Sequence, residues 1–314
     1  MADASAVGDA ALIEDLRARV RGEVRPGEPL ARHTTLRVGG PAAALVVAET
    51  PEDLEAVAQV CGVHDRGWLI IGRGSNLLVA DQGWAGVAVL LGTAFRGVDI
   101  DGHRVVAGGA EPMPALAAQA AKAGLGGLAF GVAIPGSVGG AVRMNAGAHG
   151  GETSRVLEWA EAARLRRGGA VERFTVEGLA MGYRHTALPD DAVVVRAGFV
   201  LEPRDQATLA AEMQEMQRWR REHQPLSEPT CGSVFANPEG DSAGRLIEAA
   251  GMKGHQVGGA RVSTKHANFI VGGLDATAAD VYRVLKDVQD AVARVHGVAL
   301  RPEVVLVGFA GEQR

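Results

Sequence analysis

The stretch GSVGGAVRMNAGAHGGE, residues Gly136–Glu152, carries far more glycine than an ordinary helix or strand. Seven of the 21 positions from 131 to 151 are glycine, at irregular intervals that exclude a collagen repeat. Val138, Val142 and Met144 stand where a flexible linker would carry serine and charge. The stretch therefore predicts a fixed backbone from which side chains have been removed so that a ligand can lie against it. A tight packing crossover between two elements is the structural alternative.

A second glycine-containing stretch, IIGRGSNLLVA, spans residues 70–80 and places Gly72–Asn76 directly after a strand-like run. It lacks the third glycine and the following helix of a dinucleotide-binding fingerprint. Its free backbone amides and serine hydroxyl can still form an anion-binding nest, and a plain hairpin turn is the alternative. Since the first stretch also carries a serine and an asparagine, Ser137 and Asn145, the two stretches together predict a site for one long ligand bearing a diphosphate.

The composition excludes several function classes. A formal charge of −5 and an aromatic content of 4% argue against a surface for duplex or single-stranded nucleic acid. Cys61 and Cys231 are the only cysteines, so neither a disulfide framework nor a thiolate metal site is expected. No apolar run is long enough to cross a bilayer, and the first residues lack the pattern of a secretion signal. We expect a reduced, cytoplasmic, metal-free protein.

Periodicity and capping signals predict mixed helices and strands. Thr50–Asp53 reads as a helix start, with threonine as N-cap, proline in the first turn and acids after it. A helix from Asp205 to about His223 carries Leu209, Met213, Met216 and Trp219 at helical spacing, which predicts a buried stripe. Further helices are expected over 9–21, 114–123, 242–250 and 277–296, and strands over 68–71, 77–80, 87–91, 105–107, 160–166, 192–201, 268–271 and in PEVVLVGF near the end.

Three further stretches carry reactive groups outside any core pattern. MGYRHT has Arg184 beside Tyr183, SEPTCGSVFANP has Ser233 and Asn237, and RPEVVLVG has Glu303 at the mouth of a strand. Taken singly, each has a structural explanation: an exposed arginine, a turn serine, a capping glutamate.

Six motifs in this order resemble the UDP-N-acetylenolpyruvoylglucosamine reductase family: GRGSNLL, IPGSVGGAVRMNAGAHGGE, MGYRH, QPLSEPTCGSVFANP, HQVGGARVSTKHANFIV and RPEVVLVG. The resemblance covers about Leu30–Gly308. It implies an α+β fold, in which a two-subdomain FAD-binding cradle of the vanillyl-alcohol-oxidase-like type adjoins a separate α/β substrate-binding domain. The implied boundaries are 1–204 for the FAD-binding domain, with subdomains at about 30–82 and 83–204, then 205–300 for the substrate domain. A C-terminal segment, 301–314, would pack back on the FAD domain.

The resemblance also implies an activity. Non-covalent FAD, reduced by NADPH, would reduce the enolpyruvyl ether of UDP-N-acetylglucosamine enolpyruvate to UDP-N-acetylmuramate, for peptidoglycan synthesis. Hydride would go to C3 and a proton to C2, and NADPH and substrate would use one site in turn on a monomer. Another FAD-dependent oxidoreductase on the same cradle, or a UDP-sugar-binding regulator that has lost its flavin, are the alternatives.

The resemblance assigns roles by position. Arg184 would be the active-site arginine, Ser233 the proton donor, and Glu303 an active-site glutamate that is either protonated or polarises Ser233 or a water. The implied substrate contacts are Tyr183, Arg221 (on the phosphate side), Asn237, Gln256, His266 and Asn268. The implied cofactor contacts are Gly72, Arg73, Gly74, Ser75, Asn76 and Leu77 in one stretch, and Gly136, Ser137, Gly139, Gly140, Asn145 and Gly147 in the other.

A few positions depart from the family's pattern. His149 stands where tyrosine is usual, Arg143 replaces an apolar or aromatic residue, and Gly272 replaces an asparagine. With Tyr183 and Tyr282 as the only tyrosines, the substrate-capping tyrosine loop of the longer subclass is not expected. The chain therefore resembles the shorter subclass.

Overall fold

The computed structural model describes residues 4–309, with side chains from residue 9 onward. Residues 1–3 and 310–314 of the expected first and last segments lie outside it. The chain divides into two compact units, and each is described here by itself. The first unit comprises the residues up to 26, 43–72 and 86–218, and the second comprises 27–42, 73–85 and 219 onward. Two short segments thus group with the C-terminal third of the chain, and the functional boundaries implied above stay a prediction.

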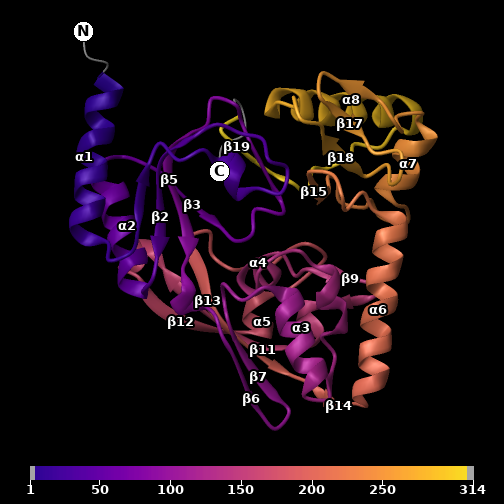
Figure 1. Ribbon diagram of the computed structural model, residues 1–314, viewed down its shortest axis with the longest axis horizontal. Helices are drawn as coiled ribbons and strands as arrows, with labels where there is room; N and C mark the ends of the chain where they lie inside the picture. Colours follow the sequence, from indigo (N-terminus) through magenta and orange to yellow (C-terminus); the bar gives the residue numbers. More distant parts are fainter. Residues whose placement is uncertain (1–3, 310–314) are drawn as a thin grey trace. The chain divides into compact units, whose positions relative to one another are not determined.

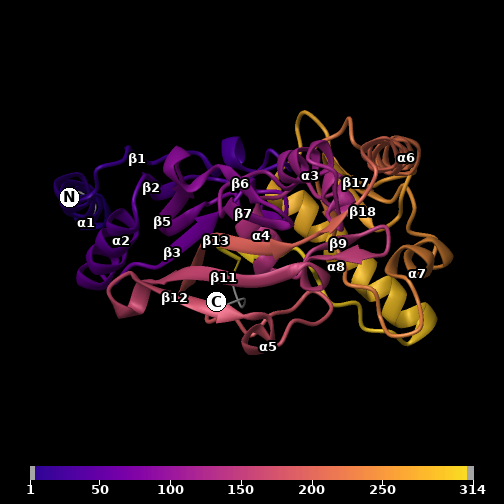
Figure 2. The ribbon, with the colours of Figure 1, turned by 90° about the horizontal axis from the view of Figure 1, so that it is seen from below.

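One sheet of the first unit is covered by two helices near the start of the chain (Figures 1 and 2). The strand order is β1 (Val24–Pro26), β2 (Ala42–Ala48), β5 (Trp84–Leu91), β3 (Trp68–Ile71), and the helices are α1 (Ala4–Arg19) and α2 (Pro51–Val63). Leu12 and Leu16 of α1 and Leu54 of α2 are buried in one cluster with strand side chains. Helix α2 begins with the predicted cap: the Thr50 hydroxyl accepts from the Asp53 amide at 3.3 Å, and the Asp53 carboxylate accepts in return from the Thr50 amide. The predicted helix start is confirmed.

The second sheet of this unit is wholly antiparallel and carries the glycine-rich stretch on one of its covering helices. Its order is β12 (Ala170–Thr175), β11 (Leu157–Arg164), β13 (Ala192–Val200), β7 (Arg104–Gly108), β6 (Val98–Asp101). Helices α3 (Met113–Lys122) and α4 (Val138–Arg143) bury Met113, Leu116, Val138 and Val142 in its core. The smaller elements are β8 (Leu125–Gly126) paired with β14 (Glu202–Pro203), β9 (Gly147–Ala148) paired with β10 (Gly151–Glu152), α5 (Val176–Leu179), and the 3₁₀ turns η1 (Leu30–His33), η2 (Thr93–Phe95), η3 (Ala129–Ala133), η4 (Thr153–Arg155) and η5 (Leu165–Arg167).

The glycine-rich stretch is a short helix followed by a tight hairpin, so the expectation of a fixed backbone is confirmed. Ser137 caps α4, accepting a hydrogen bond from the Gly140 amide at 3.3 Å. Some of these glycines are required by close packing, as the alternative of a tight packing crossover predicted. A Cβ at Gly139 would approach the Val194 carbonyl to 3.2 Å, and one at Gly151 would meet the Phe130 ring at 2.6 Å.

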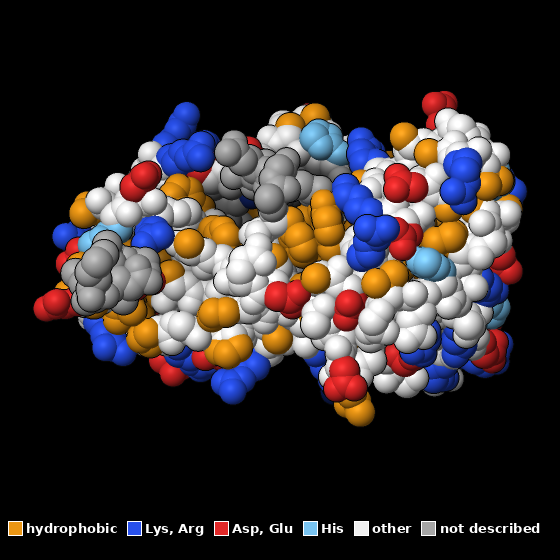
Figure 3. All heavy atoms as spheres, turned by 90° about the horizontal axis from the view of Figure 1, so that it is seen from above, with side chains coloured by type: hydrophobic (Ala, Val, Ile, Leu, Met, Phe, Trp, Pro, Cys, Tyr) orange, Lys and Arg blue, Asp and Glu red, His pale blue; other side chains and the backbone are white. Residues whose placement is uncertain are grey.

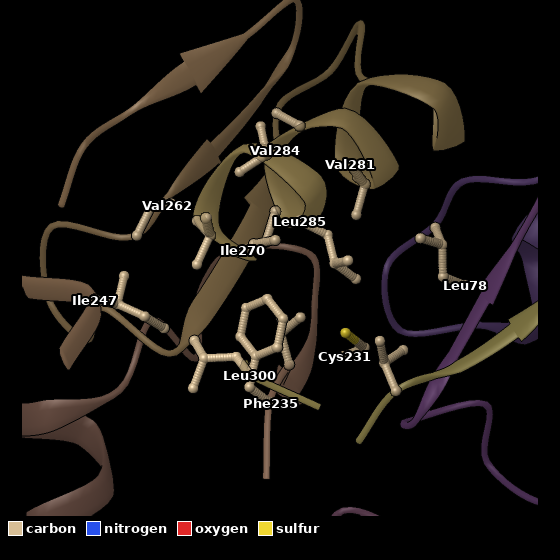
Figure 4. Packing of buried hydrophobic residues seen from close by; sticks show 14 of the residues in the cluster. Leu78, Cys231, Phe235, Ile247, Val262, Ile270, Val281, Val284, Leu285 and Leu300 are labelled. Carbon is tan, nitrogen blue, oxygen red and sulfur yellow. The ribbon is translucent and has the colours of Figure 1, made fainter. Parts of the chain in front are cut away.

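The second unit is built on an antiparallel sheet covered by two helices. The strand order is β15 (Thr230–Ser233), β18 (Phe269–Gly272), β17 (Ala260–Val262), β16 (Gln256–Val257), and the helices are α7 (Ala243–Ala249) and α8 (Ala278–His296). Figure 4 shows Phe235 within the core cluster that includes Leu285 and Leu300. Helix α8 begins with a Thr277–Asp280 capping box and ends at Gly297 in the left-handed conformation, so the expected helix over 277–296 is confirmed.

A two-stranded parallel ladder completes the second unit. Strand β4 (Leu77–Val79) pairs with β19 (Val305–Val307), from near the end of the described chain. Strand β3, which precedes the turn at residues 72–76, pairs instead with β5. The turn therefore joins strands of two different sheets, and the hairpin alternative is wrong.

The expectation of a buried stripe on the helix after Asp205 is wrong in part. Helix α6 (Gln206–His223) buries Leu209, but Met213 and Met216 are only partly buried and Trp219 is 38% exposed. The helix leaves the first unit after Arg218 and continues into the second. A helix that passes from one unit to another lacks a continuous core along its length, and its polar residues occupy most of its surface.

The surface mixes both signs of charge. On the face that Figure 3 shows, basic and acidic side chains are interspersed, in keeping with a net charge of −5. Among residues 4–309, no helix is long and apolar enough to cross a membrane.

Candidate active site

Arg184 lies in a tight turn of the first unit. Gly182 and His185 exchange backbone hydrogen bonds of 2.9 and 3.1 Å, which closes the turn around Tyr183 and Arg184. Arg184 has a φ of 54°, a left-handed conformation that favours glycine and costs a larger residue roughly 1–2 kcal/mol. Its guanidinium lies 5.0 Å from the centre of the Tyr183 ring and donates to the Gly147 carbonyl at 3.2 Å. The arginine is thus held against the glycine-rich stretch by its side chain as well as its backbone.

Asn145, in the middle of the glycine-rich stretch, supports this turn. Its side chain is 1% exposed, and its Nδ2 donates to the Gly182 carbonyl at 3.0 Å while its Oδ1 accepts from the Ser154 amide at 2.9 Å. Both ends of the amide therefore bind protein backbone. A direct contact between Asn145 and a cofactor stays a prediction.

Arg143 has a structural explanation that the sequence did not reveal. Its guanidinium donates to the carbonyls of Leu188 at 3.1 Å, Pro189 at 3.0 Å and Ala192. The Thr186 hydroxyl donates to the Arg143 carbonyl at 3.0 Å in return. The end of α4 is thus tied to the segment that follows the arginine turn. Three carbonyls that converge from another segment leave no periodic signal in a sequence.

Gly72, the last residue of one stretch that belongs to the first unit, meets Ser137 of the other stretch. A Cβ at Gly72 would lie 2.8 Å from the Ser137 hydroxyl, so only a glycine allows this approach. Gly72, Arg73 and Gly140 are all exposed, and a Cβ at Gly140 would contact the Ser137 hydroxyl at an ordinary 3.5 Å. A serine hydroxyl beside exposed, side-chain-poor backbone fits a cofactor that carries a diphosphate.

Other predicted cofactor residues have local structural reasons for their identity. Gly74 has a φ of 62°, and a Cβ there would come within 1.9 Å of the His33 carbonyl. Gly147 lies in the β9–β10 hairpin, where a Cβ would meet the Gly151 carbonyl at 2.6 Å. Leu77 is buried in β4. Gly136 and Ser75 are partly buried in their turns, and the cofactor contacts of all these residues stay predictions.

Three motifs distant in sequence converge in the second unit. Ser233 ends β15 opposite Phe269, after a break in register at Gly232, whose φ is 79°. The next carbonyl, of Val234, accepts from the Glu303 amide at 2.8 Å. The Glu303 carbonyl in turn accepts from Asn76 Nδ2 at 3.1 Å. The Glu303 backbone therefore contacts both the residue after Ser233 and the side chain of Asn76 in the GRGSN turn.

The Glu303 carboxylate also acts on the strand that carries the serine. Burial raises the pKa of the Cys231 thiol to about 12, and the charge of Glu303 adds to the shift. Cys231 lies two residues before Ser233 on the same strand, β15. The Glu303 charge thus reaches the thiol of Cys231 and disfavours its ionisation.

Asn268 fixes the loop after the serine. Its side chain is 4% exposed, with Oδ1 accepting from the Phe235 amide at 3.0 Å and Nδ2 donating to the Phe235 carbonyl at 2.8 Å. Its carbonyl accepts from the Val234 amide at 2.9 Å. Asn268 therefore determines the path of the chain from Val234 to Phe235, and its predicted contact with substrate remains untested.

The other predicted substrate residues lie on the periphery of this unit. The His266 ring packs edge-on against the Phe269 ring, with 4.7 Å between the ring centres. Burial, together with the charges of Lys253 and His223, lowers the pKa of His266. Asn237 is exposed and accepts from the Ala243 amide at 3.0 Å, at the start of α7.

Gln256 and Arg221 are both exposed. Gln256 lies on β16, and Arg221 lies near the end of α6, where its carbonyl accepts a hydrogen bond from the Lys265 ammonium. Lys265, which the sequence analysis did not single out, thus adds a cation on the expected phosphate side. Its contact with α6 is long-range and leaves no local signal.

Family models match both parts of the chain. A model described as an FAD binding domain matches residues 42–172, and one described as the C-terminal domain of UDP-N-acetylenolpyruvoylglucosamine reductase matches residues 224–307. The first contains both glycine stretches, and the second contains Ser233 and Glu303.

Whole-chain relatives agree with the models. The chain is 42% identical over 299 residues to the UDP-N-acetylenolpyruvoylglucosamine reductase of Bacillus velezensis. The alignment covers 95% of this chain and 98% of that reductase. The chain is 40% identical to the reductase of Bacillus subtilis, with the same coverage. The crystal structure of the reductase from Thermus caldophilus is similar with a TM-score of 0.79 at 37% identity, covering 91% of this chain and 99% of that one. The expected α+β FAD-binding fold is confirmed.

Proposed function

The chain belongs to the UDP-N-acetylenolpyruvoylglucosamine reductase family, and from this premise we propose that Arg184, Ser233 and Glu303 carry its reaction. The chain is an FAD-dependent oxidoreductase that uses NADPH to reduce UDP-N-acetylglucosamine enolpyruvate in peptidoglycan precursor synthesis. The observation that supports the residue assignment best is that the Glu303 backbone is hydrogen-bonded both to Val234, the residue after Ser233, and to the side chain of Asn76. A different oxidoreductase on the same cradle would have no need of these contacts.

We propose that Gly72, Ser137 and Gly140 help to hold the cofactor without a covalent bond, and the exposed backbone at the two glycines supports this. Bound FAD, once reduced by NADPH, supplies the hydride for C3 of the enolpyruvyl group. The protein's part is to hold the backbone of the two glycine stretches fixed and to keep water from the reacting carbons.

Arg184 is the proposed electrostatic catalyst. As hydride reaches C3, negative charge develops at C2 and spreads into the substrate carboxylate. A guanidinium held in place before the reaction stabilises that charge without reorganisation, and one such donor contributes ~2.7–4 kcal/mol. The tight turn and the hydrogen bond to the Gly147 carbonyl supply the required rigidity.

Ser233 is the proposed proton donor to C2. A serine hydroxyl is a weak acid, but a carbanion-like carbon is a strong base, so transfer within a positioned pair is feasible. We propose that Glu303 polarises Ser233, directly or through a water. The hydrogen bond from the Glu303 amide to the carbonyl of Val234, the residue after Ser233, supports this role.

The remaining assignments follow from the chemistry of the ligands. We propose that NADPH and the UDP-sugar, each with a diphosphate, use one site in turn, with Arg221 on the phosphate side and Tyr183, Asn237 and Gln256 as further contacts. The protein is proposed to act as a monomer in the cytoplasm. The FAD-binding domain is proposed over 1–204 and the substrate domain over 205–300.

The test is Ser233→Ala, followed by rapid-mixing spectroscopy of each half-reaction. Reduction of the flavin by NADPH needs no proton at the sugar and is expected at a rate near that of the wild type. Reoxidation by UDP-N-acetylglucosamine enolpyruvate should slow by ~10³–10⁴-fold, and Ser233→Cys should recover part of the rate. Ser227→Ala, an exposed serine in the same loop region, is the matched control and should change neither step. Reoxidation of the alanine variant at wild-type speed would exclude Ser233 as the donor.

A further inference from the structure

We propose that Asn145 is a positioning residue that acts through Arg184, setting the guanidinium for the charge that develops on the substrate. This inference rests on the catalytic role proposed for Arg184. It assigns to the asparagine of the glycine-rich stretch an action on the arginine turn, instead of a contact with the flavin.

The first observation is the strain in the turn. Arg184 occupies the left-handed region, with a φ of 54°, in a four-residue turn where glycine or asparagine is usual. Such a conformation persists only where the surroundings hold it. The turn's own closure consists of the two backbone bonds between Gly182 and His185.

The second observation is what holds the turn from outside. The Asn145 Nδ2 donates to the carbonyl of Gly182, the first residue of the turn, and its Oδ1 is anchored by the Ser154 amide. Since Asn145 is 1% exposed, water competes poorly for either bond. The side chain of Arg184 then reaches the Gly147 carbonyl, two residues beyond Asn145. The turn is therefore attached to the glycine-rich stretch at both its backbone and its side chain.

The third observation is the conformation of Asn145 itself, with a φ of 40°. Asparagine and aspartate tolerate this region better than other side chains that are not glycine. A glycine would fit the backbone but would lack the amide, so asparagine meets both the conformational and the hydrogen-bonding requirement. This explains an asparagine at this place in a stretch rich in glycine.

Asn145→Asp, measured at alkaline pH, is the sharpest variant, because the ionised carboxylate keeps the size, the tolerance of positive φ and the acceptor for Ser154, and lacks the donor to Gly182. A misplacement of about 1 Å in a catalytic group can cost ~100-fold, so reoxidation by the enolpyruvyl substrate should slow by roughly 10- to 100-fold. Flavin reduction by NADPH should change by less than about twofold. Asn145→Ser adds no charge, and its side chain is too short to reach Gly182. It should slow reoxidation as Asn145→Asp does, which would show that the effect does not come from destabilisation by a buried carboxylate.

Two further measurements separate positioning from general support. Hydrogen exchange of the His185 amide, which closes the turn, should be faster in both variants of the holoenzyme. In an Arg184→Met background the Asn145 substitutions should add almost nothing, since residues that act as a unit are not additive. Thr153→Val is the matched control: it removes a buried 2.9 Å bond from the Thr153 hydroxyl to the Ala146 carbonyl without touching the turn. It should leave both half-reactions and the His185 exchange unchanged.

The outcomes distinguish this proposal from the one on which it rests. Suppose that Arg184→Met slows reoxidation selectively. If Asn145→Asp and Asn145→Ser do not slow it, or if their rate losses multiply in full with that of Arg184→Met, the positioning role is wrong and the role of Arg184 stands. If Arg184→Met fails to slow reoxidation selectively, the catalytic assignment of Arg184 is wrong, and the positioning role is overturned with it.

Discussion

Replacing Asn268 with alanine should destabilise the second unit strongly, because its side-chain amide pairs with both backbone groups of Phe235. Phe235 is 1% exposed, so its amide and carbonyl have little access to water once these bonds of 3.0 and 2.8 Å are lost. Each buried group left without a partner costs ~1–3 kcal/mol, which gives about 2–6 kcal/mol for the pair. Hydrogen exchange across peptides of the second unit, measured in increasing urea, reports this loss separately from the stability of the first unit.

Asn268→Asp tests the same role of Asn268 through the dependence of stability on pH. The new carboxyl keeps the acceptor for the Phe235 amide but turns an oxygen toward the Phe235 carbonyl, and burial should raise its pKa above the ordinary value for aspartate. A raised folded pKa means that stability increases as the pH falls toward that pKa, because the protonated form can donate to the carbonyl. This variant should therefore gain stability as the pH falls through the raised folded pKa toward the unfolded value of about 3.9.

Asn237→Ala is the control for Asn268, since it removes an exposed amide that accepts from Ala243, and should cost about 1 kcal/mol. A loss below about 1 kcal/mol for Asn268→Ala would mean that water or another group satisfies Phe235, and the structural role given to Asn268 would be wrong.

Three other predictions follow from burial and from the glycine stretches. Burial raises the pKa of both Cys61 and Cys231 to about 12. Neither thiol should therefore react with Ellman's reagent at mildly alkaline pH in the native protein, whereas both should react in urea. Fast labelling of either thiol in the native protein would contradict the burial. Burial also lowers the pKa of His266 from 6.5. The contribution of His266 to the free energy of unfolding is therefore complete above pH 6.5 and is lost as the pH falls through the folded pKa. If His266→Gln left the pH dependence of the unfolding free energy unchanged, this reasoning would be refuted. Acid precipitation should release the yellow flavin into the supernatant, and colour that stays with the pellet would indicate a covalent bond, for which His149 would be the first residue to examine.

Local signals in the sequence predicted the ends of α2 and α8 well, whereas α1 begins five residues before the expected start at Asp9. Thr50 and Thr277 cap α2 and α8 because the capping interaction lies within four residues, and Gly297 ends α8 because only its own φ is involved. Pairing between distant segments has no such signal. The strand at Leu77–Val79 was predicted, yet its partner at Val305–Val307 could be known only from the fold.

The roles of the two asparagines illustrate the same limit in the site. Asn145 was predicted as a ligand contact because its amide lies in a glycine-rich stretch, and Asn268 because the family resemblance implied it. Their partners, the Gly182 carbonyl and the Phe235 backbone, lie more than thirty residues away in sequence. The residue types were informative, and the partners were not predictable from them.

The parallel pairing of β4 with β19 sets a time at which the second unit can be completed during synthesis. Strand β4 leaves the ribosome about 230 residues before β19, which at 5–20 residues per second is a delay of roughly 10–45 s. Throughout that interval the hydrophobic strand Leu77–Leu78–Val79 has an open edge and no partner of its own sheet. The nascent chain is therefore exposed to mispairing and to chaperones for most of its translation, and the turn that carries Asn76 reaches its final contacts with Glu303 only when nearly the whole chain has been made.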